Sequence, residues 1–428
     1  MQTSLAGFIK DTPQGAEAET ILRQCVHCGF CLATCPTYQL LGDELDSPRG
    51  RIYLIKQVLE GEPATPETRL HLDRCLTCRA CETTCPSGVQ YSQLLTIGRA
   101  LSESGLPRSP LEQLKRYLLR TILGHRGRFS SLLALARLLA PLLPPQLARK
   151  IPARTHSAAR LQPGGGAQPG WPPARHARKV LILEGCVQAV LEPGINLAAA
   201  RVLDRIGISA IRAPEAGCCG ALAHHLSAAE AAVCQARCNI DAWWPHIEAG
   251  AQAIASTASA CAAMVGEYGS LLRDDPRYAA RAARVSELVR DISEILAAER
   301  ATLEGLLQPP LPAQGPRAGG GTRVAFHSPC TLQHALRIRD AVEPLLAAAG
   351  CALTAVPDSH LCCGSAGTYS LLEPQLSSQL LERKVRALQT GSPDLIVTAN
   401  IGCLLQLRDG TTTPVLHWIE LLAARLAP

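Results

Sequence analysis

Eight cysteines in the first ninety residues form two runs of the same type. The runs are Cys25-x2-Cys28-x2-Cys31-x3-Cys35-Pro36 and Cys75-x2-Cys78-x2-Cys81-x3-Cys85-Pro86. Three closely spaced thiolates wrap one corner of a 4Fe–4S cluster, and in two-cluster ferredoxins the fourth cysteine of a run binds the other cluster. We therefore expect two 4Fe–4S clusters, one on Cys25, Cys28, Cys31 and Cys85 and the other on Cys75, Cys78, Cys81 and Cys35.

Structural zinc is the main alternative for these cysteines, because zinc also takes four thiolates. Zinc sites usually pair two CxxC units or combine Cys with His, whereas a doubled four-cysteine run with a terminal proline is typical of iron–sulfur proteins. Exchange of the fourth ligand would also lock the two runs together. Folding and cluster binding should then be coupled.

Eight further cysteines belong to a tandem repeat in the second half of the chain. The first copy contains Cys186, Cys218, Cys219 and Cys261, and the second contains Cys330, Cys362, Cys363 and Cys403. The offsets are 144, 144, 144 and 142 residues, and a glycine (Gly220 or Gly364) follows each adjacent cysteine pair. Agreement at four positions predicts a duplication, and we refer to the two repeats as the first and the second Cys-Cys-Gly copy.

Strands and helices alternate in both copies. Apolar stretches predict strands at 180–183 and 253–255 in the first copy and at 324–326 and 395–397 in the second, with helices at 198–206 and 341–349. This alternation is typical of α/β units with a largely parallel sheet. We expect the last strand of each copy to lead to its fourth cysteine, so that the four cysteines of a copy meet at the carboxyl edge of the sheet.

Helices should frame the N-terminal cysteines. Ser47-Pro48 is a plausible helix start, and a second apolar-periodic stretch with Leu70 and Leu72 precedes Cys75. Residues 107–140 carry apolar stripes with helical spacing. The apolar run at 130–143 is too short to span a bilayer, and we interpret it as a core or interfacial helix.

The predicted fold class is therefore α/β multidomain, with an N-terminal alpha-helical ferredoxin module followed by two tandem α/β Cys-Cys-Gly units with largely parallel sheets. Pro/Gly-rich linkers are expected at 141–178 and 308–321. The predicted domains are 1–105 (ferredoxin), 106–178 (basic helical segment and linker), 179–300 (first copy) and 322–428 (second copy).

The charge of the chain is unevenly distributed. Residues 107–178 contain thirteen Lys or Arg and one Glu, a local charge of +12, so the net charge of +6 leaves −6 for the rest. This segment could dock on an anionic membrane surface or an acidic partner, or serve as a solvated tether. It contains few aromatic residues, so we predict no nucleic-acid partner.

The sequence lacks the signature motifs of several enzyme classes. No G-x-G-x-x-G follows a predicted strand and no Walker A loop is present, so the chain needs a partner for two-electron chemistry. The N-terminal residues contain no apolar run of signal-peptide length. With nineteen cysteines, this favours a cytoplasmic protein with metal or redox chemistry.

Both cysteine-rich parts resemble known modules. The crossed two-cluster layout resembles the alpha-helical ferredoxin modules of respiratory dehydrogenases, and the repeat resembles the cysteine-rich CCG domain of the heterodisulfide reductase family. Paired copies in that family hold iron–sulfur clusters with five cysteines each, whereas the fifth position here is Met264 or Gln406. The resemblance therefore leaves open a further cluster, a four-ligand site, a redox-active cysteine pair or a scaffold without metal.

The chain as a whole resembles the iron–sulfur subunits of bacterial glycolate oxidase, through residues 25–62 and 71–89 and through the order of its motifs. The resemblance implies that the eight N-terminal cysteines are cluster ligands. It also implies a glycolate dehydrogenase complex in which FAD-containing flavoprotein subunits oxidise glycolate to glyoxylate. This chain would pass the electrons towards a quinone or another acceptor, as a peripheral protein on the cytoplasmic face of the inner membrane.

Three other functions remain open. The chain could serve anaerobic glycerol-3-phosphate dehydrogenase or a lactate-oxidising system, reduce disulfides at the Cys-Cys-Gly sites, or be a zinc-stabilised binding module. The remaining cysteines, Cys234, Cys238 and Cys351, are interpreted as buried packing residues.

Overall fold

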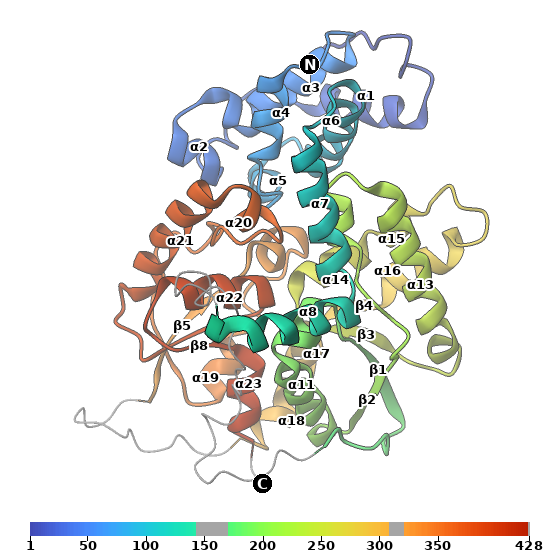
Figure 1. Ribbon diagram of the computed structural model, residues 1–428. Coiled ribbons are helices and arrows are strands. Elements are labelled where there is room, and N and C mark those ends of the chain that lie inside the picture. The colour runs from blue at the N-terminus through green and yellow to red at the C-terminus, as the bar shows by residue number, and fades with distance from the viewer. Residues whose placement is uncertain (143–169, 308–320, 427–428) are drawn as a thin grey trace. The chain divides into compact units, whose positions relative to one another are not determined.

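The computed structural model describes residues 1–142, 170–307 and 321–426 (Figure 1). The predicted linkers at 141–178 and 308–321 therefore lie largely outside the described residues. The chain forms two compact units. The first contains Met1–Arg116, Ser328–Arg337 and Pro357–Ala387, and the second contains Tyr117–His327, Ile338–Val356 and Leu388–Pro428.

Short helices make up the N-terminal part of the first unit (blue to teal in Figure 1). They are α1 (Pro13–Gln24), α2 (Pro36–Leu41), α3 (Pro48–Leu59), α4 (Pro66–Asp73), α5 (Ala80–Thr84) and α6 (Tyr91–Gly105). Four of them begin at Pro, and three of these four follow Thr12, Ser47 or Thr65, whose hydroxyl accepts a backbone N–H of the first turn. Such caps satisfy N–H groups that a helix leaves unpaired, and the predicted start at Ser47-Pro48 is confirmed.

The apolar faces of α1, α3, α4 and α6 share one core. Leu22, Ile55, Leu59 and Leu94 are fully buried in it, together with cysteines of both N-terminal runs. Each such side chain contributes about 2 kcal/mol through burial. The helices therefore form a rigid frame from which the cysteine loops are held.

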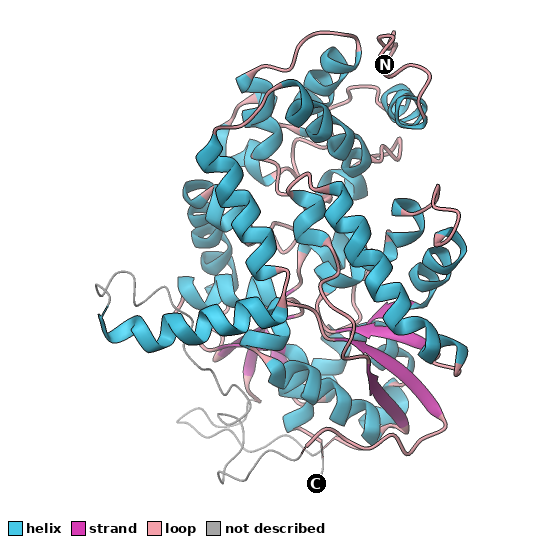
Figure 2. Cartoon of the chain, turned by 45° about the vertical axis from the view of Figure 1, so that its right-hand side comes forward, coloured by secondary structure: helices cyan, strands magenta, loops and turns pink. Residues whose placement is uncertain are grey.

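Two four-stranded parallel sheets form the β structure of the second unit, with the orders β2-β1-β3-β4 and β6-β5-β7-β8 (strands magenta in Figure 2). The strands are β1 (Arg178–Leu183), β2 (Ile208–Arg212), β3 (Ala253–Ser256), β4 (Val289–Asp291), β5 (Arg323–His327), β6 (Ala352–Leu353), β7 (Leu395–Thr398) and β8 (Val415–His417). All residues of β3 and β7 are buried, as expected for strands covered on both faces.

Helices connect these strands. Those of the first copy are α10 (Val187–Leu191), α11 (Pro193–Arg205), α12 (Ala221–His225), α13 (Ala229–Glu248), α14 (Ser259–Gly266), α15 (Tyr268–Leu271), α16 (Ala279–Leu288), α17 (Ile292–Ala298) and α18 (Arg300–Glu304). Those of the second copy are α19 (Glu343–Ala348), α20 (Tyr369–Leu372), α21 (Pro374–Gln389), α22 (Ile401–Gly410) and α23 (Trp418–Ala424).

The structure corrects two details of the predicted copies. Strands β3 and β7 are not the last ones, because β4 and β8 follow. Strand β4 begins directly after α16 without an intervening turn residue, which hides it in the sequence. In addition, Cys261 and Cys403 lie in the first turns of α14 and α22 and not at strand ends.

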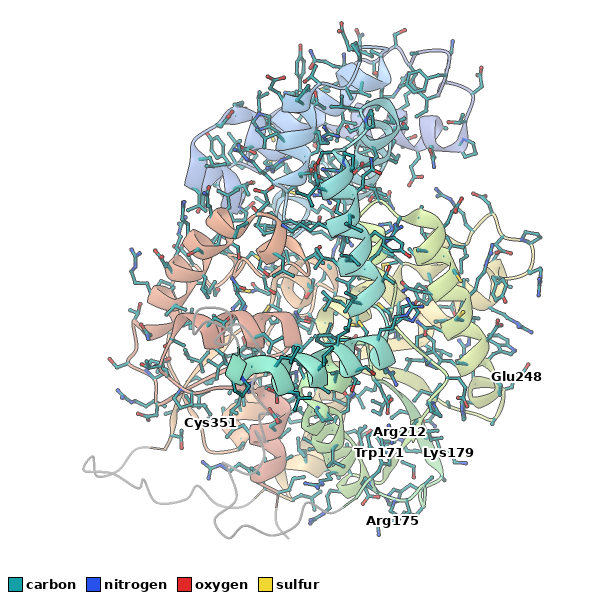
Figure 3. All side chains as sticks on the ribbon, in the orientation of Figure 1. Trp171, Arg175, Lys179, Arg212, Glu248 and Cys351 are labelled. Carbon is teal, nitrogen blue, oxygen red and sulfur yellow. The ribbon has the colours of Figure 1, made fainter. Side chains whose placement is uncertain are left out.

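Residues just before β1 are fastened to the edge of the first sheet. The indole N–H of Trp171 donates to the carbonyl oxygen of Ala210 at 2.9 Å, and the Arg212 guanidinium lies 5.2 Å from the Trp171 ring centre (Figure 3). A cation over an aromatic face is a favourable contact. Because Ala210 and Arg212 belong to the edge strand β2, Trp171 is attached to this edge of the sheet.

The basic segment contains two helices, α7 (Pro110–Leu123) and α8 (Arg126–Leu139), as predicted. The apolar run at 130–143 was expected to be a core or interfacial helix. For its described residues, 130–142, the core interpretation is wrong, because Leu133 is the one buried residue of α8. No residue of α7 is buried. Both helices expose leucines: Leu111, Leu114, Leu118, Leu132, Leu135, Leu138 and Leu139.

Candidate cluster sites and Cys-Cys-Gly sites

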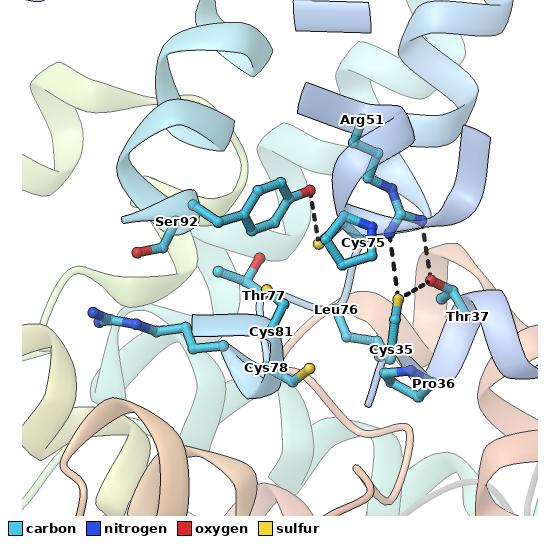
Figure 4. Close-up of a pocket in the computed structure, with 13 residues that line it drawn as sticks. Cys35, Pro36, Thr37, Arg51, Cys75, Leu76, Thr77, Cys78, Cys81 and Ser92 are labelled. Carbon is cyan, nitrogen blue, oxygen red and sulfur yellow. Dashed lines mark hydrogen bonds between the residues drawn. The ribbon is translucent and has the colours of Figure 1, made fainter. Parts of the chain in front are cut away.

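The fourth cysteine of the first run lies beside the first three of the second run. A cavity of about 380 Å³, part of it open to solvent, is lined by Cys35, Cys75, Cys78 and Cys81 (Figure 4). We call it the Arg51 cavity, because the Arg51 side chain also lines it.

A second cavity gathers the remaining cysteines of the two runs. It encloses about 440 Å³, again partly open to solvent, and its lining includes Cys25, Cys28, Cys31 and Cys85. We call it the Arg49 cavity after another of its lining residues. Each of the two crossed sets of cysteines expected from the sequence therefore lines one cavity, and Cys81 lines both.

The two runs share an unusual backbone conformation. His27 and Gly29 have φ of 56° and 86°, and the matching residues of the second run, Thr77 and Arg79, have φ of 53° and 61°. A left-handed conformation costs a residue other than glycine roughly 1–2 kcal/mol. Alternating left-handed residues turn successive N–H groups toward one side, which favours an anionic ligand such as a thiolate-bound cluster.

Burial favours the protonated form of some of these thiols in the absence of metal. It raises the pKa of Cys31 to about 11 and raises the pKa of Cys78 and Cys81 well above the usual thiol value. Thiolate is the form that binds metal, so a bound cation would have to displace these protons. Four soft sulfur donors around each cavity fit an iron–sulfur cluster, which requires such ligands.

The sequence did not reveal the polar side chains beneath the Arg51 cavity. Arg51 is 1% exposed, donates to the Thr37 hydroxyl and the His71 carbonyl oxygen, and pairs with the buried Asp46 at 3.1 Å. Its Nη1 also lies 3.9 Å from the Cys35 sulfur. The sequence contains only a weak indication of this arrangement, namely one basic residue, Arg51, on the apolar face of α3.

The four cysteines of the first Cys-Cys-Gly copy lie close together. Cys186 Sγ is 3.5 Å from Cys218 Sγ, and Cys219 hydrogen-bonds with both Cys218 and Cys261. Donation from the Cys186 and Cys219 thiols lowers the pKa of Cys218 well below its usual value. Cys186 before α10, the Cys-Cys-Gly loop and the first turn of α14 thus bring four sulfurs together. The grouping agrees with the sequence prediction, although Cys261 is not at a strand end.

The second copy distributes its cysteines differently. Cys330 Sγ lies 3.9 Å from Cys362 Sγ, and both residues pack with Leu76 and Cys78 of the N-terminal region in one apolar cluster. All four belong to the first compact unit, whereas Cys403 belongs to the second. Cys363 is buried, and Cys403 is buried with its sulfur 3.7 Å from the Asn400 amide nitrogen.

The three remaining cysteines were only partly predicted. Cys351 is buried, as expected (labelled in Figure 3). The prediction is wrong for Cys234 and Cys238, which are exposed on α13. Their i, i+4 spacing puts both on the same side of the helix, and α13 packs through other residues, Ala232, Ala236 and Ile240 among them.

Comparison with known proteins now decides the family. Residues 21–89 match the family described as 4Fe-4S dicluster domain, and residues 180–266 and 324–408 match the family described as Cysteine-rich domain. The glycolate oxidase iron–sulfur subunit of Escherichia coli K12 is 52% identical over 426 residues, covering 100% of this chain and 99% of that protein. The chain belongs to the glycolate oxidase iron–sulfur subunit family.

More distant relatives agree with this assignment. A probable glycolate oxidase iron–sulfur subunit of Bacillus subtilis is 31% identical and covers 91% of this chain and 89% of that protein. Lactate utilization protein A 2 of Bacillus mycoides is 28% identical but covers only 58% of this chain and 99% of that protein. A crystal structure of a hypothetical protein from Helicobacter pylori has a TM-score of 0.52 at 10% identity, over 97% of this chain and 72% of that one, and supports the fold alone.

Family membership settles part of the sequence interpretation. The resemblance and the fold class, a helical dicluster region followed by two parallel-sheet α/β units, are confirmed. An iron–sulfur subunit works by electron transfer, so the predicted class of function, within an oxidoreductase complex, is confirmed at that level. Among the described residues, no helix has the length and apolar content needed to cross a membrane.

Proposed function

We propose that this chain is the electron-transfer subunit of a glycolate-oxidising complex and holds two 4Fe–4S clusters through exchanged ligands. Cys25, Cys28, Cys31 and Cys85 would bind one cluster in the Arg49 cavity, and Cys75, Cys78, Cys81 and Cys35 the other in the Arg51 cavity. The crossed lining of these two cavities is the observation that carries the proposal.

The protein's own residues would bind the clusters and control their surroundings. Bound clusters would each accept and release one electron. The left-handed residues of the two runs, His27 and Thr77 among them, orient backbone N–H groups toward the cavities. Buried Cys35 and Cys75, with the apolar core behind them, keep water away from one side of the Arg51 cavity.

Substrate chemistry would occur on partner subunits. The relatives named glycolate oxidase iron–sulfur subunit favour glycolate as the substrate of the complex. We infer that FAD-containing flavoproteins oxidise it to glyoxylate and that a quinone or another acceptor receives the electrons. The lactate-related proteins align with little more than half of this chain, so glycolate is the favoured substrate over lactate. Turnover of the purified complex with glycolate, lactate and glycerol 3-phosphate would separate these candidates. Clearly faster turnover of lactate or glycerol 3-phosphate would contradict the choice of glycolate.

The helices α7 and α8 support a peripheral location on an anionic membrane, as on the cytoplasmic face of an inner membrane. Leu111 is 76% exposed and Leu138 is 75% exposed, on helices that also carry several Arg side chains. Exposed leucines beside basic residues are typical of helices that lie in a membrane interface. Flotation with anionic vesicles at low salt should carry the full chain upward; recovery of the whole chain in the pellet would contradict this location.

Metal analysis of ligand variants tests the exchanged ligands. Anaerobically purified wild type should contain at least about eight irons per chain and show the EPR signals of two reduced clusters. Cys35→Ser and Cys85→Ser should each lose most of one cluster, about four irons, and each should remove a different signal. Cys351→Ser is the matched control, because Cys351 is buried and lines neither cavity, and it should keep all the iron.

Three results would contradict all or part of this proposal. Protein with zinc and without iron or acid-labile sulfide would identify a zinc-stabilised module. Cys35→Ser and Cys85→Ser variants that keep both signals unchanged would contradict the exchange of ligands while leaving the clusters themselves intact. Disulfide reduction by the chain alone would favour a heterodisulfide-reductase-like enzyme instead.

A further inference from the structure

Side-chain donors reach the cysteine sulfurs of one cavity. In the Arg51 cavity the Arg51 Nη1 donates to Cys35 Sγ at 3.9 Å, and the Thr37 Oγ1 lies 3.3 Å from the same sulfur. The Tyr91 hydroxyl donates to Cys75 Sγ at 3.6 Å. Figure 4 shows Arg51 of α3 and Thr37 of α2 beside the Cys35 sulfur, with the contacts drawn as dashed lines.

The Arg51 side chain is fixed in place and keeps its charge. Its Nε donates to the His71 carbonyl oxygen at 2.7 Å, and its Nη2 lies 3.1 Å from the Asp46 carboxylate. Asp46 also pairs with Arg74 at 2.9 Å, so one buried carboxylate is shared by two guanidinium groups. A net positive charge therefore remains beside the Cys35 sulfur, in surroundings where water screens it weakly.

The Arg49 cavity has no equivalent arrangement: Tyr91 lines this cavity too, but its hydroxyl donates to Cys75 Sγ. Within the described ranges, no side-chain hydrogen bond reaches the sulfur of Cys25, Cys28, Cys31 or Cys85. The positive groups near this cavity contact other atoms: the Arg49 Nη1 lies 3.4 Å from the His27 carbonyl oxygen, and the Met1 ammonium donates to the Cys25 carbonyl oxygen at 2.7 Å.

Solvent also reaches the Arg49 cavity more readily. Cys28 is exposed, and Val26 and Phe30 beside it are 68% and 62% exposed. Arg49 is itself partly exposed and paired with Glu44. Water and this partner both weaken the field of Arg49 at the sulfurs.

We propose that Arg51 and Tyr91 are positioning residues that raise the reduction potential of the centre on Cys35, Cys75, Cys78 and Cys81 above that of the centre on Cys25, Cys28, Cys31 and Cys85. This inference rests on the proposed function, because it requires both clusters. Reduction adds one negative charge to a cluster and its thiolates. Donors to the sulfurs and a nearby cation stabilise that added charge, and cluster potentials respond to both.

Burial alone predicts the opposite order. A drier site disfavours added charge, so the more buried thiols around the Arg51 cavity would lower the potential of their centre. The positive charge of the guanidinium in contact with Cys35 opposes this effect. The same low dielectric strengthens the attraction between that charge and the added electron. The order of the two potentials therefore depends on Arg51 and Tyr91, and electrons should collect at the centre whose Cys78 packs with Cys330 and Cys362.

An EPR-monitored redox titration of the full chain under anaerobic conditions tests this inference. Wild type should show two separate midpoint potentials. Tyr91→Phe, which removes one hydroxyl, should shift the more positive potential downward and leave the other unchanged. Arg51→Gln should shift the same potential further downward, and Arg51→Lys should fall between wild type and Arg51→Gln because it keeps the charge but loses the planar fork.

Arg49→Gln is the matched control, since Arg49 also belongs to α3 but faces the other cavity. It should leave the more positive potential unchanged. The inference would be overturned if Tyr91→Phe and Arg51→Lys, with full iron content, left both potentials unchanged or moved the more negative one. It would also be overturned if Arg49→Gln moved the more positive potential as far as Arg51→Gln. Wild-type protein without iron would instead contradict the proposed function itself.

Discussion

The two Cys-Cys-Gly copies have the same cysteine spacing but different surroundings. The first copy holds Cys186, Cys218, Cys219 and Cys261 within one compact unit, with their sulfurs linked to one another. In the second copy, Cys330 and Cys362 pack against N-terminal residues of the first unit, while Cys403 belongs to the second unit. A duplicated motif therefore need not give a duplicated site, because each copy's neighbours decide what its thiols can do.

The largest effect expected from this difference concerns metal content. We predict that the first copy binds additional metal, so that wild type contains more than about eight irons per chain. Cys219→Ser should abolish the excess, because Cys219 lies in the middle of the four linked thiols. The measurement is iron and acid-labile sulfide per chain after anaerobic purification.

Cys330→Ser is the control for this prediction, since it changes the residue of the second copy that matches Cys186. It should keep the excess iron. A wild type with only about eight irons would contradict metal binding by the first copy and would favour thiol chemistry there. Loss of the excess in both variants would contradict the difference between the copies.

The sequence predicted those features that depend on local spacing. The two four-cysteine runs indicated which distant cysteines would share a cavity, and the four matched offsets indicated two α/β copies. Both patterns work because the chemistry of soft ligands and the period of strands and helices are set by short stretches of chain. The crossed cysteines were foreseen for this reason.

Features that depend on tertiary packing were not predicted. Arg51 and Tyr91 reach cysteine sulfurs only because α3 and α6 pack together, and nothing in their sequence neighbours indicates this. Cys234 and Cys238 were expected to be buried because α13 is apolar, but the helix buries other residues. Strand β4 was not predicted, because three residues directly after a helix are too few to show the alternation of apolar and polar residues that indicates a strand.

A second difference between the copies lies at two equivalent helix starts. Asp291 is the last residue of β4 and precedes α17, and its carboxylate accepts the Ser293 N–H at 2.9 Å. Burial raises the pKa of Asp291 to about 7. The folded state therefore binds this proton more tightly than the unfolded state, and the free energy of unfolding should fall as pH rises from about 4 to 7, by on the order of 4 kcal/mol.

Asp291→Asn should remove this decrease, because the amide stays neutral. Above pH 7 the variant should be more stable than wild type, by on the order of 2–4 kcal/mol. Thermal unfolding at a fixed scan rate between pH 5.5 and 8 measures the effect. A variant that keeps the wild-type pH dependence would show that Asp291 does not hold the proton.

The second copy has His417 at the equivalent helix start, before α23. Its Nε2 donates to the Thr257 carbonyl oxygen at 2.8 Å, its Nδ1 accepts the Ile419 N–H, and burial lowers its pKa to about 4. The unfolded chain binds this proton more tightly, so stability should be complete above about pH 6.5 and decrease toward pH 4, by on the order of 3 kcal/mol. In thermal scans extended down to pH 4, His417→Asn should reduce this loss of stability at acid pH. An unchanged loss in the variant would mean that other groups cause it.

The smallest expected effect compares the glycines of the two Cys-Cys-Gly loops. Gly364 has φ of +85°, and an added Cβ would lie 2.6 Å from the Ser377 carbonyl oxygen. Gly220 has a similar φ of +92°, but its Cβ would lie 3.3 Å from its nearest neighbour, the Ala232 carbonyl oxygen. Both alanine variants should lose about 1–2 kcal/mol of stability through the left-handed backbone.

Gly364→Ala should lose about 1–3 kcal/mol more, because its added Cβ would lie 2.6 Å from a backbone oxygen, compared with 3.3 Å at Gly220. Denaturant unfolding of the two variants beside wild type measures the difference. Equal losses would mean that the loop of the second copy relaxes as easily as that of the first. A larger loss at Gly364 would show that the second loop is held more tightly by its neighbours, Ser377 and Leu380 of α21, as expected if packing outside the motif fixes the position of Cys362 and Cys363.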